Sequence, residues 1–194
     1  IVPDENYGRE VMQLFSIGLV ERNQDFSPVL DGSGQTVPTY DSAVVAAMSR
    51  VFTGWTYAGQ TDANYGRVDG RSYAPMECHP AYHDDQPKAI FRGIVIANGN
   101  DCAATLERAL DALSQHPNTA PFISRQLIQR FVTSNPSPGY IQRVGQAWTT
   151  SGGDLGRVLR AILLDGEART APAAGDATFG KPREPLLRIA HLWR

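Results

Sequence analysis

The chain has 194 residues, of which 42% are hydrophobic and 20% charged, and 18 Lys and Arg residues face 20 Asp and Glu residues. This composition is typical of an ordinary globular domain. The near-neutral charge balance argues against a dedicated nucleic-acid binder, which needs clustered Lys and Arg in excess. No apolar stretch approaches the ~20 residues that a bilayer crossing requires, so we expect no membrane span in this chain.

The amino-terminal third predicts two helices separated by a polar loop. Within residues 6–19, apolar residues recur at intervals of three and four positions, at Val11, Leu14, Phe15 and Leu19, which indicates one face of an amphipathic helix. Residues 21–39 are polar and rich in turn formers. Helical spacing returns over residues 44–55, with Thr39 or Asp41 as the expected N-cap.

Regular spacing disappears between residues 57 and 87, where Gly, Asp, Asn and aromatic residues accumulate. Long irregular segments inside compact domains often carry function. Residues 88–96 are β-branched and interrupted by Gly93, which predicts a small strand or hairpin. We call residues 56–100 the central excursion and expect any functional site to lie there.

The remaining sequence is strongly helical. Helices are predicted over residues 106–113, 122–132, 138–148 and 155–163, with Ser137 and Asp154 as N-caps of the last two. Pro182 opens a short helix that continues to residue 193. The predicted fold is therefore mainly α: a multi-helix single domain over residues 1–194, with a small β-hairpin element and the long irregular central excursion.

Residues 77–88 hold the densest set of chemically active side chains. His79 and His83 are four positions apart, and with Asp84 they would supply nitrogen and oxygen ligands for a divalent metal. Pro80 and Pro87 make a regular helix doubtful at this point, so the pattern is weaker than a HExxH motif. The alternative is a surface turn with solvated histidines and aspartates that accept backbone hydrogen bonds.

A metal-free arrangement uses similar residues for acid–base chemistry. His83 would act as the base beside Asp84, Glu10 would supply a second carboxyl group, and Lys88 or Arg125 would stabilise developing negative charge. This combination predicts a hydrolase with a cleft in which Glu10, His83 and Lys88 converge. The alternatives are a solvent-facing Glu10 and a structural ion pair for Arg125.

The central excursion is also aromatic. Its aromatic residues suit stacking on sugars or docking to a partner, and equally suit a local core that keeps a long loop folded. They are Tyr57, Tyr65, Tyr73 and Tyr82, together with Trp55 directly before the excursion. The second functional hypothesis is therefore a non-catalytic helical module that binds a partner protein or a glycan.

The only two cysteines, Cys78 and Cys102, lie 24 positions apart. They form either a disulfide or two unpaired thiols, and their spacing leaves both alternatives open.

Several phrases in chain order resemble one family. They are residues 6–19, residues 52–55, His83-Asp84 with Lys88 and Gly93, residues 116–132, residues 153–155 and residues 181–185. Together they resemble the carboxy-terminal half of the bacterial family called domain of unknown function 1800. The shared polar pattern matches Asn6, Arg9, Glu10, His83, Asp84, Lys88, Arg125, Lys181 and Glu184, whereas Gly8 replaces the alanine that is usual in the family.

The resemblance implies an exported, extracytoplasmic protein, periplasmic or secreted, and thereby favours a disulfide between Cys78 and Cys102. It also implies an amino-terminal helical half that is absent here, in agreement with the abrupt start at Ile1. That half, or another envelope protein, is the expected partner. The resemblance supplies no activity and no catalytic residues.

Overall fold

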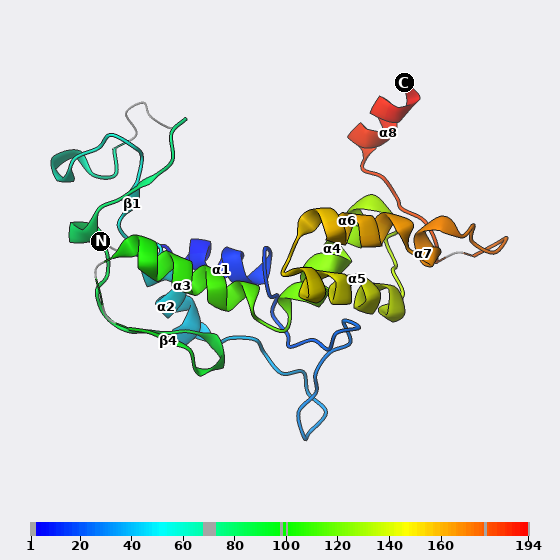
Figure 1. Cartoon of the computed structure of the whole chain (residues 1–194), viewed down its shortest axis with the longest axis horizontal. Helices are drawn as coiled ribbons and strands as arrows, with labels where there is room; N and C mark the ends of the chain where they lie inside the picture. Colours follow the sequence, from blue (N-terminus) through cyan, green and yellow to red (C-terminus); the bar gives the residue numbers. More distant parts are fainter. Residues whose placement is uncertain (1–2, 68–72, 98, 100, 177, 194) are drawn as a thin grey trace. The chain divides into compact units, whose positions relative to one another are not determined.

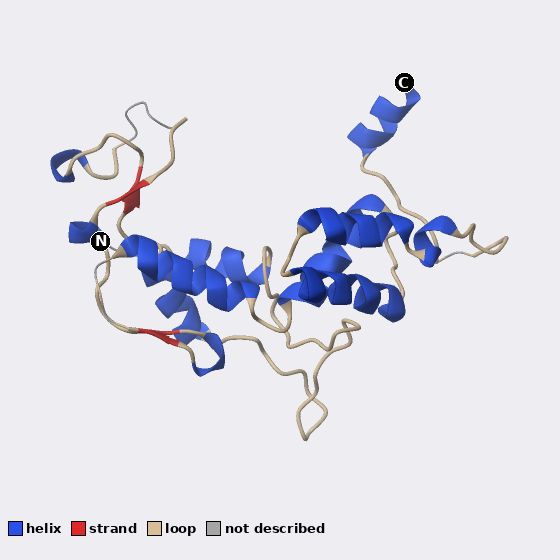
Figure 2. Cartoon of the chain, viewed as in Figure 1, coloured by secondary structure: helices blue, strands red, loops and turns tan. Residues whose placement is uncertain are grey.

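A computed structural model describes residues 3–67, 73–97, 99, 101–176 and 178–193. The chain divides into two compact units, which are described separately: Ile1–Glu21 with Leu30–His116, and Arg22–Val29 with Pro117–Arg194. Helices dominate both units (Figure 2), so the mainly α fold is confirmed. Among the described residues, no helix is long and apolar enough to cross a bilayer.

Three helices form the body of the first unit (Figure 1): α1 (Glu5–Gln13), α2 (Ser42–Val51) and α3 (Cys102–Ser114). Asp41 caps α2 by accepting a hydrogen bond from the Val44 N–H, as the sequence predicts. Helix α2 packs against both α1 and α3. The buried core of this unit includes Met12, Ile17, Val45, Met48, Val51, Ile90, Phe91, Ile96, Ala109 and Leu113.

Helix α1 ends at Gln13, so the prediction that it continues to Leu19 was wrong. The Ser16 hydroxyl donates to the Val11 carbonyl, and the backbone N–H groups of Ile17 and Gly18 both donate to the Met12 carbonyl. Gly18, four positions after the C-cap Leu14, adopts the left-handed conformation with a φ of 72°. The apolar spacing therefore continues past the point where local hydrogen bonds end the helix.

Gly8 permits a close approach between α1 and α2. A Cβ added at Gly8 would lie 3.0 Å from the Ser49 backbone nitrogen. The same approach brings the rings of Tyr7 and Phe52 together edge to face, with their centroids 4.8 Å apart. Glycine is thus used here for packing, despite its low helix propensity.

The central excursion contains two small antiparallel strand pairs. Strand β1 (Trp55–Thr56) pairs with β2 (Glu77–Cys78), and β3 (Lys88–Ala89) pairs with β4 (Val95–Ile96). The second pair is the predicted hairpin, which is confirmed. The first pair was not predicted, because a strand of two residues is too short to show the alternation of apolar and polar side chains that indicates a strand. Residues 68–72, 98 and 100 of the excursion lie outside the described residues.

The second unit is a helical assembly with its own core. Its elements are α4 (Thr119–Phe131), α5 (Pro138–Ser151), α6 (Leu155–Leu164), α7 (Gly166–Arg169) and α8 (Pro185–Leu192). Helix α5 packs against α4 and α6 around Ile128, Tyr140, Ile141, Val144, Val158 and Ile162. Ser137 and Asp154 cap α5 and α6 as predicted. Helix α8 begins three residues later than predicted, at Pro185.

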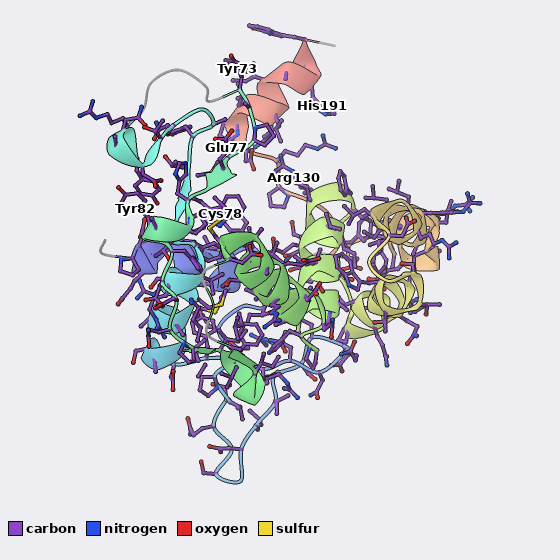
Figure 3. All side chains as sticks on the ribbon, turned by 60° about the vertical axis from the view of Figure 1, so that its left-hand side comes forward. Tyr73, Glu77, Cys78, Tyr82, Arg130 and His191 are labelled. Atoms are coloured by element: carbon purple, nitrogen blue, oxygen red, sulfur yellow. A yellow bond between two sulfur atoms is a disulfide. The ribbon has the colours of Figure 1, made fainter. Side chains whose placement is uncertain are left out.

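Cys78 and Cys102 form a disulfide, shown in yellow beside the Cys78 label in Figure 3. It joins β2 to the first residue of α3, where Asp101 caps the helix. Cys102 is fully buried. The bond therefore fastens the start of α3 to the β1–β2 pair.

Replacing both cysteines with alanine should lower the free energy of unfolding of the first unit by ~3 kcal/mol, because the unfolded chain regains the entropy of a 24-residue loop. Urea denaturation followed by circular dichroism measures the change. A reducing agent should shift the wild type to the midpoint of the variant and leave the variant unchanged. Equal midpoints for the oxidised wild type and the variant would contradict the prediction.

Candidate functional site

His83 is buried, and both of its ring nitrogens have partners. Nδ1 lies 2.9 Å from the Thr53 carbonyl oxygen, and Nε2 lies 3.1 Å from the Thr105 hydroxyl. A carbonyl only accepts hydrogen bonds, so Nδ1 carries the donated hydrogen and Nε2 faces the hydroxyl of α3. The imidazole thus links the residues that follow α2 to α3.

Thr53 occupies the centre of this polar network. Its hydroxyl donates to the Arg50 carbonyl at 2.7 Å and accepts from the Asp84 backbone N–H at 2.8 Å. The next residue, Gly54, has a φ of 84°, and a Cβ there would lie 3.0 Å from the Cβ of His83. The chain after α2 is therefore held tightly against the segment that carries His83 and Asp84.

Lys88 is also fully buried. Its Nζ donates to the backbone carbonyls of Asp84 and Gln86, and lies 3.4 Å from Asp84 Oδ1. Burial lowers the pKa of Lys88, and the Asp84 carboxylate opposes that shift. Arg50 Nη1 approaches the same carboxylate oxygen at 3.3 Å. Asp84 thus pairs with two cations, Arg50 and Lys88, while Lys88 closes the loop over residues 84–88.

His79 has different partners from His83. Its Nδ1 lies 2.8 Å from Asp62 Oδ1, and its ring meets that of Tyr65 edge to face. Throughout the described ranges, no three His, Cys, Asp or Glu side chains form a group that could hold a metal ion. The predicted ligand roles of His79, His83 and Asp84 stay predictions that no such cluster supports.

Glu10 lies on α1, where its Oε2 is buried without a hydrogen-bond partner among the described residues. The Tyr40 hydroxyl is likewise buried without a partner. Burial raises the pKa of Tyr40, Arg9 opposes the shift, and Glu10 adds to it. Glu10 is therefore electrostatically coupled to Tyr40.

Arg125 belongs to the second unit. Its guanidinium lies 4.7 Å from the ring centre of Phe26, which Arg22 also approaches, at 4.6 Å. Burial lowers the pKa of Arg125, and the nearby Arg22 adds to the effect. Of the five predicted catalytic residues, His83, Asp84 and Lys88 thus belong to one hydrogen-bonded network around Thr53, whereas Glu10 and Arg125 have other neighbours.

The first unit has an open apolar pocket of about 700 Å³, which we call the aromatic groove. It is lined by Pro3, Asp4, Tyr7, Val11, Ser49, Phe52, Thr53, Trp55, Tyr65, Pro75, Met76, Leu106 and Leu110. Thr53 belongs both to this lining and to the polar network. The network therefore fixes part of the groove wall.

The aromatic side chains of the groove support one another. Tyr65 stacks on Tyr82 with ring centroids 4.0 Å apart, and the Tyr82 hydroxyl donates to the Asp62 carbonyl. Trp55 also lines the groove, and its Nε1 is buried with no hydrogen-bond partner in the described part of the chain. Tyr73, by contrast, is 85% exposed.

The sequence identified Trp55 and Tyr65 of this groove but missed its helical walls. Leu106 and Leu110 both lie on α3 and line the groove, and Leu110 is 49% exposed. Periodicity shows which residues share a helix face, and this signal cannot separate a core from an open groove.

Replacing Thr53 with valine should destabilise the first unit by about 1–3 kcal/mol, because the partly buried Asp84 N–H loses its acceptor. Thr53→Ser keeps the hydroxyl and is the matched control, with a smaller loss. Urea denaturation of the two variants beside the wild type measures both effects. Equal stability of the valine variant and the wild type would show that the hydroxyl is dispensable.

Comparison with known proteins identifies a family and nothing closer. No curated protein and no solved structure matches the chain. A family model described as "Protein of unknown function (DUF1800)" matches residues 2–194. Because that match covers nearly the whole sequence, the chain belongs to the DUF1800 family.

Proposed function

We propose that the chain is a non-catalytic binding module of the cell envelope whose aromatic groove takes an apolar segment of a partner protein. The observation that carries the proposal is an open groove of about 700 Å³ with a mostly apolar lining. Apolar side chains of a docked segment would remove this surface from water, which is the main favourable term in such association.

A protein segment suits the groove better than a glycan does. One face of Tyr65 is already covered by Tyr82, and the edge of one ring in the Tyr7–Phe52 pair covers the other ring. Stacking on a sugar needs free aromatic faces, whereas an apolar side chain fits between ring edges and aliphatic groups such as Leu106 and Leu110.

The polar residues support the same proposal. His83 bonds to Thr53 and Thr105, Asp84 bonds to Thr53 and pairs with Arg50, and Lys88 donates to the Asp84 carbonyl. This network holds the groove wall at Thr53. The disulfide supports an extracytoplasmic location, because such bonds persist mainly in oxidising compartments. The docked segment would come from the amino-terminal half that the family resemblance implies, or from another envelope protein.

Leu110→Asp should weaken binding of an apolar probe to the groove about tenfold, because the substitution places a charge in the apolar lining. The probe is anilinonaphthalene sulfonate, whose fluorescence reports binding. Leu163→Asp, at a comparably exposed leucine of the second unit, is the matched control and should leave binding unchanged. Equal losses in both variants would contradict the proposal.

Competition then separates the two ligand classes. Helical peptides with Leu or Phe anchors at i, i+3 and i+7 should displace the probe, and neutral oligosaccharides should not. Displacement of the probe by oligosaccharides alone would indicate that the groove binds a glycan and not a protein segment. Failure of every anchored peptide would overturn the proposed peptide binding.

An extracytoplasmic hydrolase is the second candidate, favoured by one observation, the buried and unpartnered Glu10 Oε2. Hydrolysis of a 4-nitrophenyl ester should then fall in Glu10→Gln and persist in Glu5→Gln, which alters an exposed glutamate of the same helix. Equal rates in both variants would exclude Glu10 from that reaction.

A further inference from the structure

Helix α8 presents an exposed apolar stripe. None of the residues of α8 is buried. Leu186, Ile189 and Trp193 recur at intervals of three and four positions and therefore share one side, where they are 76%, 48% and 87% exposed. Leu192 beside them is 84% exposed. A contiguous apolar face of this kind marks an interaction surface.

The helix is attached to the end of α4 through other residues. Leu187, 100° around the helix from Leu186, is partly buried and lines a small hollow with Phe131 and Val132. Glu184 pairs with Arg130 at 3.3 Å, and the Lys181 Nζ donates to the Arg130 carbonyl. These contacts hold the start of α8 against the end of α4. The side chains of the stripe take no part in them and stay exposed.

Cations accompany the stripe. Lys181, Arg183, Arg188 and His191 line a hollow of about 560 Å³. Arg183 Nη1 lies 2.6 Å from His191 Nε2, and because a guanidinium only donates, the imidazole nitrogen accepts. Glu184 is the single acidic residue of sequence positions 181–193, and Arg130 already pairs with it. The segment is therefore apolar on one side and cationic beside it (Figure 3 labels His191 and Arg130).

We propose that residues 181–193 dock on an anionic phospholipid surface. The Leu186, Ile189 and Trp193 stripe would enter the boundary between headgroups and acyl chains, and Lys181, Arg183 and Arg188 would meet lipid phosphates. An apolar face that includes tryptophan, flanked by basic side chains, is the combination that places a helix in a membrane interface. The cationic surround favours this occupant over an uncharged protein groove, which would leave the cations unmatched.

Vesicle co-sedimentation of the 194-residue chain tests the proposal. The chain should pellet with vesicles of phosphatidylglycerol and phosphatidylcholine about tenfold more strongly than with phosphatidylcholine alone, and high salt should reduce that binding. Trp193→Ser and Ile189→Ser should each weaken it several-fold. Leu163→Ser, on exposed α6 surface, and Leu110→Ser, in the aromatic groove, are matched controls that should bind as the wild type does.

Two double variants test how much the positive charges contribute to vesicle binding. Arg183→Gln with Arg188→Gln should remove the preference for anionic vesicles, whereas Arg157→Gln with Arg160→Gln, which alters exposed arginines of α6, should retain it. All changed residues are exposed or line the open groove, and circular dichroism verifies that each variant remains folded.

Three results would overturn the proposal. Equal binding to both vesicle types would show that the segment does not prefer anionic lipid. Competition by free inorganic phosphate would indicate that the segment binds a soluble anion instead. Self-association abolished by Trp193→Ser, without vesicle binding, would assign the stripe to a second copy of the chain. Since Leu110→Ser changes the groove alone, the lipid test and the groove test fail independently.

Discussion

The first unit depends on the satisfaction of buried polar groups around the Thr53 hydroxyl. This one oxygen donates to the end of α2 and accepts from the segment that carries His83 and Asp84. Burying an unpaired backbone N–H costs free energy comparable to a lost hydrogen bond. The hydroxyl therefore allows a loop with few apolar side chains to lie against two helices, and Lys88 completes the arrangement by bonding the loop's carbonyls.

The same chemistry explains why a catalytic interpretation of the sequence was attractive. Acid–base catalytic sites often contain a histidine, an aspartate and a lysine, which occur here within six positions. Buried structural hydrogen-bond networks use the same residue types. What separates the two is whether the polar atoms face one another or a ligand. In this chain the ring nitrogens of His83 bond to Thr53 and Thr105, which is information that spacing does not contain.

Prediction from sequence succeeded where a local signal decides the structure. Asp41, Ser137 and Asp154 cap helices because their side chains reach the backbone N–H three positions on, and the sequence displays that geometry directly. The end of α1 was mispredicted because Ser16 and Gly18 override a continuing apolar pattern. The groove was missed because its walls come from five separated parts of the sequence, and their meeting depends on Gly8 and on a disulfide across 24 positions.

The course of the chain between the two units has a consequence for dissecting the protein. Arg22–Val29 belongs to the second unit, although both of its sequence neighbours belong to the first. Within the second unit, the Arg22 N–H donates to the Asn118 side chain, and the Phe26 ring contacts the guanidinium groups of Arg22 and Arg125 and lies near Phe122. A fragment that starts at residue 117 would lack residues 22–29, which pack against the core of the same unit. During synthesis, likewise, the 22–29 segment lacks its packing partners until almost a hundred further residues have been translated, and no single cut in the chain separates the two units.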